Sequence, residues 1–331
     1  MGAGKRWTGG AAAVLLFTGM FTTALMPEAR SQAYPSKPAR VVVGFPPGQT
    51  TDLTARLFAD KLTSLLGQTY FVENRPGAGG IIAHEAVKVA APDGYTLLIS
   101  SSGPLAINPA LYKSLPYDPV RDFAGIIRIN TSPQYLVVNV ATPVKNLQEL
   151  VAYVKARPGQ TNYGSGGSGT TTHITTEMFK LGAGMDTTHV PFKGSPAMIT
   201  ALLGGQLDFF FEPAPTVVPL AKAGKVRVIA VTFPRRTDTM PDVPTIAEQG
   251  FPGFEATSWS SLMAPAGTPV TIVQTINKAM NAALAQPEVA ARIRANGSIP
   301  TGGSSAEFEQ FLRAELSRWG DAVRASGAKV D

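Results

Sequence analysis

The sequence predicts an α/β protein in which a largely parallel sheet is covered by helices. Short runs rich in β-branched residues alternate with longer segments that carry apolar residues at helical spacing. Turns rich in glycine and proline separate these segments, as in consecutive β-α-β units. The alternation occurs twice with no low-complexity linker between, which predicts two similar α/β halves joined by crossing strands.

The first half alternates strands and helices with few interruptions. We expect strands over residues 39–45, 69–76 and 95–103, and helices over residues 50–67 and 79–94. The first of these helices has leucines near helical spacing and a glycine stop at Gly67. A run of this kind is typical of a parallel sheet whose strands are connected by covering helices.

The second half repeats the pattern and then becomes mostly helical. The expected strands are residues 133–140, 161–166, 188–192, 207–213 and 226–232. The expected helices between them are residues 146–157, 171–184, 195–205 and 217–224. Beyond Pro269 we expect helices over residues 271–286, 287–297 and 305–326.

The first 33 residues are typical of a secretory signal peptide. Lys5 and Arg6 precede an apolar run over residues 9–26, and Ser31 and Ala33 suit a cleavage site after Ala33. A retained membrane anchor is the alternative, which the many Ala, Gly and Thr residues of the run disfavour. The sequence has no Cys, so we expect neither a lipid anchor nor disulfides. The predicted location is the periplasm, reached by the general secretory route.

Composition and charge narrow the class of ligand. The formal net charge is +6, but the basic residues are scattered and form no basic run interleaved with aromatics. We therefore expect no nucleic-acid partner, and a mildly positive field suits a small anion. No cluster of His, Cys and Asp has metal-ligand spacing, so we expect no metal and no cofactor.

The segment 163–179 contains a glycine loop with the spacing G-x-G-x-x-G, starting at Gly164. This spacing is a dinucleotide fingerprint when an acidic residue ends the next strand, roughly 20 residues on. Asp186 lies at about that distance, but it precedes the expected strand and so lies at the wrong end for a ribose. Exported proteins also seldom meet soluble nicotinamide. The dinucleotide interpretation is therefore disfavoured, and a P-loop is excluded by the missing lysine.

The same loop also suggests a hydrolase. A nucleophile elbow needs G-x-S-x-G, and Thr170 stands where its last glycine is required. Ser168 and His173 remain a conceivable pair, so a periplasmic hydrolase that uses them is the alternative function. A lone helix histidine is more often a packing or capping residue.

A third interpretation uses the backbone of the glycine loop. Glycines allow a close approach of the chain, and the start of the following helix offers free N–H groups and a positive dipole end to an oxyanion. Thr170 and Thr171 add hydroxyl donors, although they could equally only cap the helix. The loop over residues 45–57 has the same form; there, Asp52 either balances the helix dipole or meets the ligand. With a third glycine-rich loop over residues 73–82, these loops would converge on one cleft.

Several segments, taken in order, resemble the Bug-type (TctC-like) substrate-binding proteins of tripartite tricarboxylate transporters. They span the mature chain almost end to end: YPSKPARVVVGFPPG, VENRPGAGG, APDGYTLL, INPALYKSLPYDPVRDFAGI, YGSGGSGTTTHI, HVPFKGSPAMITALLGGQLD and MPDVPTIAEQGFPGFEATSW.

The resemblance implies a type II periplasmic-binding-protein fold, with two α/β domains around a ligand cleft joined by two crossing strands. Domain 1 would comprise residues 34–133 and 258–331, and domain 2 residues 134–257. The resemblance also implies a monomeric, non-enzymatic receptor. It would capture a small organic carboxylate, such as an aliphatic or aromatic dicarboxylate, and deliver it to the membrane permease subunits of such a transporter.

The resemblance further implies which residues would bind the ligand. They are Phe45, Pro47, Gly48, Thr51, Asp52, Ser165, Gly169, Thr170, Thr171, His173 and Asp208. Gln49, which departs from the family, is a further candidate: its amide either hydrogen-bonds a ligand carboxylate directly or only restricts the loop. A structural role at the start of a strand is the alternative for Asp208. Gln49 and Ala83 replace glycines that the family usually has, and Glu212 stands where Asp is more common. These departures bear on which carboxylate is bound, which the sequence does not name.

Overall fold

The computed structural model describes residues 1–2, 4–5, 7, 9 and 34–328 of the chain. Residues 34–331 group into one compact unit. The predicted signal peptide and its cleavage site after Ala33 lie largely outside the described residues. In the described part of the chain, no helix combines the length and the apolar character that crossing a membrane requires.

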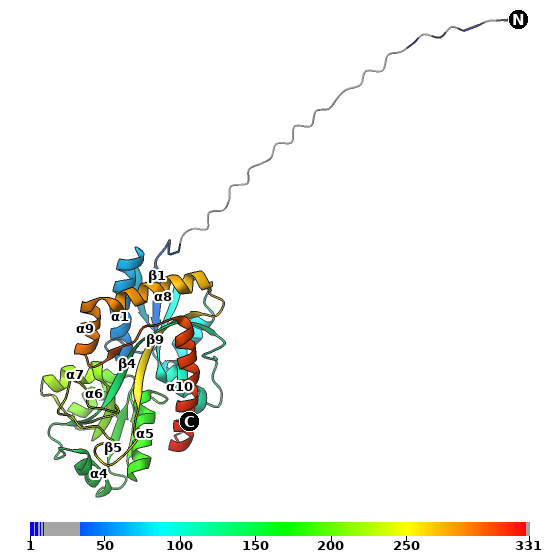
Figure 1. The fold of residues 1–331 in the computed structure, drawn as a ribbon. Helices are drawn as coiled ribbons and strands as arrows, with labels where there is room; N and C mark the ends of the chain where they lie inside the picture. Colours follow the sequence, from blue (N-terminus) through cyan, green and yellow to red (C-terminus); the bar gives the residue numbers. More distant parts are fainter. Residues whose placement is uncertain (3, 6, 8, 10–33, 329–331) are drawn as a thin grey trace. The chain divides into compact units, whose positions relative to one another are not determined.

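Within residues 34–328, ten strands form one mixed sheet (Figure 1). They are β1 (Ala39–Val43), β2 (Tyr70–Asn74), β3 (Thr96–Ser101), β4 (Phe123–Asn139), β5 (Asn162–Ser165), β6 (Thr188–Pro191), β7 (Phe209–Pro213), β8 (Val226–Val231), β9 (Thr257–Pro265) and β10 (Ile299–Pro300).

Helices cover the sheet on its faces. They are α1 (Thr50–Leu66), α2 (Ile81–Lys88), α3 (Asn108–Leu111), α4 (Leu147–Lys155), α5 (Thr171–Ala183), α6 (Ser195–Leu203), α7 (Ala214–Lys222), α8 (Val270–Ala285), α9 (Pro287–Ala295) and α10 (Ser305–Ser326). A 3₁₀ turn, η1 (Ala78–Gly80), precedes α2, and a π-helical turn, η2 (Gly103–Ile107), precedes α3.

The strand order is β2-β1-β3-β9-β4-β7-β5-β6, with β8 and β10 also paired to β4. Strands β1, β2 and β3 run parallel to one another, and we call them the β1 set. Strands β5, β6 and β7 are also mutually parallel and form the β5 set. The loops that leave the carboxyl ends of the two sets carry the glycine-rich motifs, so the sheet order decides where those motifs can meet.

Strands β4 and β9 connect the two sets. The first part of β4 pairs antiparallel with β9, and its last part, from Gln134, pairs with β7 and β8. Strand β9 is buried along its whole length and lies between β3 and β4. The crossing strands implied by the resemblance are therefore present, whereas the domain boundaries at residues 134 and 257 stay a prediction.

Apolar packing explains most of the expected elements. Val41 and Val43 on β1 pack with Phe58 and Leu62 of α1 in one buried cluster. Helix α1 ends at Gly67, whose φ of 73° is the left-handed conformation that glycine adopts without a steric penalty. The predicted strand and helix order through residue 103 is confirmed.

Several parts of the fold differ from the expectation. Strand β4 begins at Phe123, about ten residues before the expected start at 133, and neither β9 nor η2 was expected. The sequence of β9, TSWSSLMAP, has too many serines to read as a buried strand. Helix α7 begins at Ala214 instead of residue 217, with Pro215 in its first turn, where proline fits a helix.

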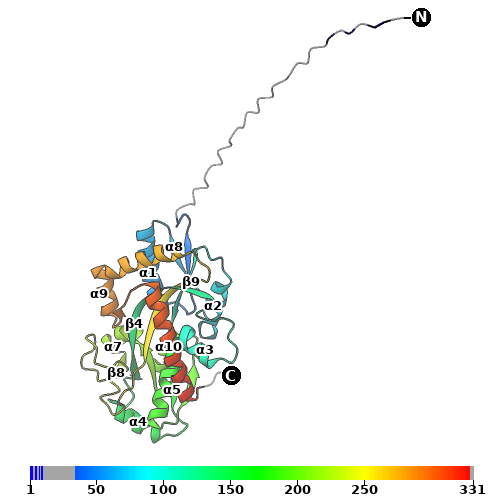
Figure 2. The same ribbon diagram turned by 45° about the vertical axis from the view of Figure 1, so that its right-hand side comes forward.

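Helix α10 runs beside helical elements that follow strands of both sets: η2 and α3 follow β3, and α5 follows β5 (Figure 2). It begins with a capping box between Ser304 and Glu307 and packs against η2, α3 and α5. Glu315, in its middle, accepts a hydrogen bond of 2.6 Å from the Trp259 indole nitrogen on β9. The C-terminal helix is therefore fastened to a crossing strand.

Candidate functional site

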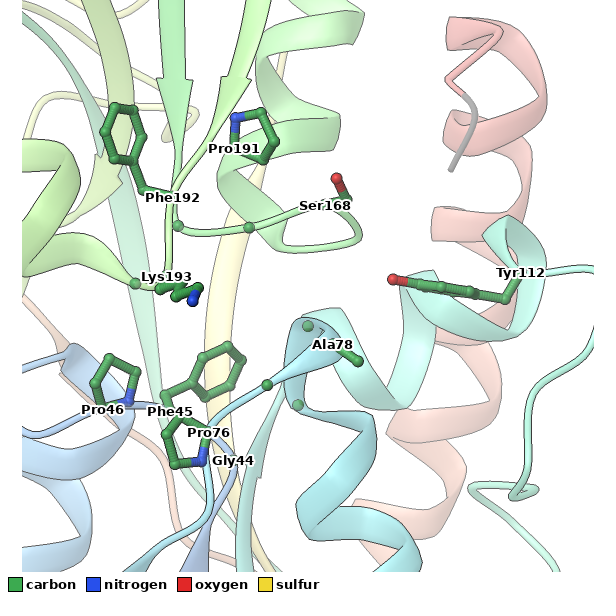
Figure 3. A pocket seen from close by; sticks show the side chains of 16 residues that line it. Gly44, Phe45, Pro46, Pro76, Ala78, Tyr112, Ser168, Pro191, Phe192 and Lys193 are labelled. Carbon is green, nitrogen blue, oxygen red and sulfur yellow. The ribbon is translucent and has the colours of Figure 1, made fainter. Parts of the chain in front are cut away.

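An open cleft of about 630 Å³, which we call the outer cleft, lies between loops that follow the two strand sets (Figure 3). One side consists of residues 44–46, residues 76–80 and Tyr112. The other side consists of residues 166–168 and 191–194. Figure 3 shows Phe45 and Phe192 on opposite sides of this cleft, with Lys193 between them. Its volume is in the range of small-molecule sites.

A smaller cavity of about 30 Å³, the inner chamber, neighbours the outer cleft and shares Phe45 with it. The residues that line it are Phe45, Gln49, Thr50, Thr51, Ser101, Gly103, Thr170, Thr171, Thr172, Glu212, Pro213 and Ser258. A cavity of this size holds about one water molecule. A small organic acid therefore needs the facing loops to separate before it can enter.

Two long helices begin at the inner chamber. Helix α1 starts at Thr50 and helix α5 at Thr171, and their N-cap residues, Gln49 and Thr170, have extended backbones. Neither N-cap side chain accepts a hydrogen bond from the first helical turn among the described residues. The first-turn N–H groups of both helices are thus left for another acceptor, and the positive ends of two helix dipoles meet there.

The cavities contain few charged groups in the part of the chain that the structure describes. Lys193 is the one basic side chain lining the outer cleft, and Glu212 is the one charged side chain lining the inner chamber. An anion in the inner chamber would therefore be held by backbone N–H groups and hydroxyls. Such a site binds a carboxylate by its oxygens.

Glu212 is the last residue but one of strand β7 and is 1% exposed. Its Oε1 accepts hydrogen bonds from the hydroxyls of Ser195 at 2.6 Å and Thr216 at 2.8 Å. Its Oε2 has no hydrogen-bond partner among the described residues, and neither do Gln49 Oε1 and Thr50 Oγ1. Burial raises the pKa of Glu212 to about 7, against the opposing effect of the two hydroxyl donors.

Asp52 is buried and holds the β1–α1 loop in place. One of its carboxylate oxygens accepts hydrogen bonds from the Gly48 N–H at 2.8 Å and from Arg56 at 3.0 Å. The other accepts from Asn74 at 2.9 Å. Burial alone would raise the pKa of Asp52, but the hydrogen bonds from Arg56, Gly48 and Asn74 outweigh it and lower the pKa. These contacts match the capping alternative, and Asp52 lines neither cavity.

Ser165, in the glycine loop, and His173, on α5, make contacts outside the lining of both cavities. The buried Ser165 hydroxyl is 2.7 Å from His189 Nε2, and the rings of His173 and His189 stack at 4.1 Å. The Gly169 N–H donates to His173 Nδ1 at 3.3 Å. Burial is the main cause that lowers the pKa of His173 to about 4 and that of His189 to about 3, so both rings are neutral near pH 7.

The remaining predicted residues divide into two groups. Phe45, Gln49, Thr51, Thr170 and Thr171 line the inner chamber, and their contacts with a ligand stay a prediction. Pro47, Gly48, Ser165, Gly169, His173 and Asp208 line neither cavity. Asp208 precedes β7, at the opposite end from Glu212, and accepts hydrogen bonds from Asn162 N–H and the Tyr153 hydroxyl. Its contacts are those of the structural alternative.

The geometry gives little support to catalysis. Ser168 lines the outer cleft, but its hydroxyl makes no hydrogen bond to His173 among the described contacts. The Ser–His pair that does form, Ser165 with His189, lies outside the lining of both cavities. Within the described residues, no group of His, Cys, Asp and Glu could hold a metal ion.

Several lining residues were not predicted. Tyr112, Phe192 and Lys193 line the outer cleft, and Ser101 and Ser258 line the inner chamber. The two serines carried no signal, because Ser101 stands in a run of three serines at the end of β3 and Ser258 lies in the serine-rich strand β9. Phe192 and Lys193 lie within a segment that supports the resemblance, so a closer reading of that segment could have found them.

Comparison with known proteins agrees with this geometry. The family model described as "Tripartite tricarboxylate transporter family receptor", TctC, matches residues 54–328. Protein BugT of Bordetella pertussis is 36% identical over 96% of this chain and 98% of its own length.

Solved structures give the same result. The R. palustris protein Rpa4515 with adipate is 36% identical, with a TM-score of 0.88 over 90% of this chain and 100% of that one. MatC from Rhodopseudomonas palustris with bound malate is 34% identical, with a TM-score of 0.84 over 88% of this chain and 100% of that one. These matches confirm the periplasmic-binding-protein fold implied by the resemblance. The chain belongs to the TctC family of tripartite tricarboxylate transporter receptors.

Proposed function

We propose that this receptor acts in the periplasm, where it closes around one small organic carboxylate and delivers it to the permease subunits of a tripartite transporter. The observation that carries the proposal is the meeting of two uncapped helix N-termini, those of α1 and α5, at a buried chamber. Each supplies N–H donors and a positive dipole end, and a carboxylate satisfies both.

The arrangement of the loops supports capture by closure. Loops from the β1 set and the β5 set face each other across the outer cleft, and the inner chamber is too small for an organic acid. The crossing strands β4 and β9 are the connection about which such a motion would occur. A ligand that contacts both sets of loops shifts the population toward the closed form.

The same observations favour a receptor over an enzyme. Ser168, the nucleophile of the hydrolase alternative, lacks a hydrogen-bonded base among the described contacts. Two of the similar solved structures are described with adipate and with bound malate, which are small carboxylates of the class proposed here. We propose that a monomer performs the function, after removal of the predicted signal peptide.

Titration calorimetry against a panel of mono-, di- and hydroxycarboxylic acids tests the proposal. We expect at least one acid to bind, and Thr171→Asp to abolish its binding, because the new carboxylate competes for the same N–H groups of α5. The matched control is Thr271→Asp, which adds the same charge to the exposed first turn of α8. Absence of any heat with every acid, in a folded protein, would contradict the proposal.

A further inference from the structure

Glu212 places a carboxyl group inside a chamber whose other polar groups suit a carboxylate ligand. It is 1% exposed and lines the inner chamber together with the first residues of α1 and α5. The donors of the chamber are directed to an anion, so a second carboxylate beside them requires an explanation. One of its oxygens, Oε1, is satisfied by Ser195 and Thr216.

The other oxygen, Oε2, has no hydrogen-bond partner in the part of the chain that the structure describes. A buried carboxylate oxygen without a donor is costly, so in a functional complex it acquires a partner. The partner has to enter the chamber, because the neighbouring side chains leave this oxygen unpaired. A ligand already held there is the group placed to provide it.

The groups that face Glu212 are neutral. Helix α6 contributes Ser195 and helix α7 contributes Thr216. The other lining residues with polar side chains are Gln49, Thr50, Thr51, Ser101, Thr170, Thr171, Thr172 and Ser258. No charged side chain is among the causes that shift its pKa. A positively charged or hydroxyl-bearing ligand group would therefore meet no competing partner at Oε2.

We propose that Glu212 is a specificity-determining residue whose Oε2 accepts a hydrogen bond from a hydroxyl or ammonium group of the ligand. The receptor would then select a hydroxy- or aminocarboxylate over the acid of the same length that lacks this donor. This inference rests on the proposed function and adds the chemistry of the ligand's second polar group. In both cases the ligand supplies a hydrogen-bond donor, and the experiment distinguishes a hydroxyl donor from an ammonium donor.

The opposite arrangement is a protonated Glu212 that donates to a second carboxylate of the ligand. The existing contacts favour the acceptor form, because the hydroxyls of Ser195 and Thr216 both donate to the same carboxyl group. The start of α7 at Ala214, two residues further on, also places a helix dipole's positive end beside it. The protonated form is nevertheless a distinct outcome of the test.

Matched acids provide the test by titration calorimetry at pH 8, which lies above the value of about 7 to which burial raises the pKa of Glu212. The four-carbon series is succinate, malate and aspartate, and the five-carbon series is glutarate, 2-hydroxyglutarate and glutamate. In at least one series we expect an acid that carries a donor to bind about tenfold or more tightly than the acid that lacks one. In the four-carbon series this means malate or aspartate compared with succinate. In the five-carbon series it means 2-hydroxyglutarate or glutamate compared with glutarate. A preference for the hydroxy acid identifies a hydroxyl as the donor, and a preference for the amino acid identifies an ammonium.

The variant Glu212→Gln keeps the size of the side chain and removes its charge. We expect it to reduce the preference for the donor-bearing acid by about tenfold. Glu315→Gln is the matched control, since Glu315 is also a buried glutamate but contacts Trp259 on β9 instead of the chamber. That variant should leave the order of affinities unchanged even if it lowers stability.

Three results would overturn the inference. Donor-free acids could bind as tightly as their counterparts in both series, or Glu212→Gln could leave the preference intact. Calorimetry in two buffers of different ionisation enthalpy could also show that succinate or glutarate binding takes up a proton, which identifies the protonated form. If no carboxylate of the wider panel binds to the folded protein, the proposed function itself fails. Binding without donor preference overturns only the role of Glu212.

Discussion

The hydroxyl oxygen of Ser102 lies 2.7 Å from the hydroxyl oxygen of Thr171, and both side chains are buried. Ser102 directly follows β3 of the β1 set, whereas Thr171 is the first residue of α5, which follows β5. This hydrogen bond joins the loops on opposite sides of the inner chamber. It links the two strand sets where the ligand is proposed to enter.

Removal of this bond should weaken ligand binding more than it weakens the fold. We expect Ser102→Ala to raise the dissociation constant about fivefold, because a hydrogen bond of about 1 kcal/mol holds the closed arrangement. Calorimetry with the best acid of the panel measures the change. Ser64→Ala, on the exposed side of α1, is the control and should have no effect. An unchanged affinity in Ser102→Ala would show that the bond plays no part in closure.

Asp52 should matter for stability, because its carboxylate holds the β1–α1 loop. Its replacement by Ala leaves the Gly48 N–H without its buried acceptor and frees Asn74, so we expect the free energy of unfolding to fall by about 1–3 kcal/mol. Urea denaturation measures this. Asp60→Ala, at an exposed position of the same helix, should stay within about 0.5 kcal/mol of the parent protein. Equal effects of the two substitutions would contradict the structural role of Asp52.

Gly79 should tolerate no side chain where the loops approach each other. Its φ is +60°, and a Cβ there would lie 2.7 Å from the backbone oxygen of Ser168 across the outer cleft. We expect Gly79→Ala to weaken ligand binding by tenfold or more, because the two loops cannot reach the same separation. Gly205→Ala is the matched control, since its φ of +73° is similar but a Cβ there meets nothing within 4 Å.

The two glycine variants separate backbone strain from a steric clash. Both should lose some stability in thermal unfolding, since alanine is strained at positive φ. Only Gly79→Ala should lose affinity. If both variants bind equally well, the approach of the loops at Ser168 is irrelevant to capture.

Stability should depend on pH through two kinds of buried group with opposite effects: the histidines His84, His173 and His189, and the carboxyl group of Glu212. Burial lowers the pKa of His84 to about 4, whereas an unfolded histidine titrates near 6.5. Between these values the unfolded chain binds a proton that the folded chain does not, so acidification destabilises the fold. Glu212, with a pKa raised to about 7, takes up its proton in the folded state first, so acidification from pH 7 to about 4.5 stabilises the fold.

Glu212→Gln removes the group whose protonation stabilises the fold on acidification. We expect its free energy of unfolding to fall more steeply than that of the parent protein between pH 6.5 and 5, by up to about 1.4 kcal/mol per pH unit. Urea titrations at several pH values measure the slope. The exposed variant Glu309→Gln should follow the parent curve. Parallel curves for Glu212→Gln and the parent protein would show that Glu212 is already ionised in this range.

An element could be predicted from the sequence when the apolar pattern of its own residues shows that it is buried. Strands such as β1 consist of apolar β-branched residues, and α1 has a regular apolar face, so both could be predicted locally. Strand β9 is equally buried but rich in serine, and its apolar residues Trp259, Leu262, Met263 and Ala264, which pack in the core, do not alternate regularly with polar ones. Nothing local distinguishes it from a loop.

The features of the site also divide into those that the local sequence could predict and those that it could not. The helix N-termini of the inner chamber could be predicted from glycines and threonines that directly precede apolar helices. The roles of Asp52 and Ser165 depend on partners such as Asn74 and His189, which are distant in sequence. Glu212 was singled out only as a departure from the family. Its unpaired oxygen became evident when the chamber's walls were brought together from separate loops.

The position of β9 has a consequence for how an exported chain acquires its shape. This strand is contributed by residues 257–265, yet it occupies the middle of the sheet, between β3 and β4. Until those residues emerge, β3 and the first part of β4 present open edges with no neighbour to pair with. Folding of the complete sheet therefore has to await the last quarter of the polypeptide. This delay would suit the predicted secretory route, along which a chain crosses the membrane unfolded from its N-terminus.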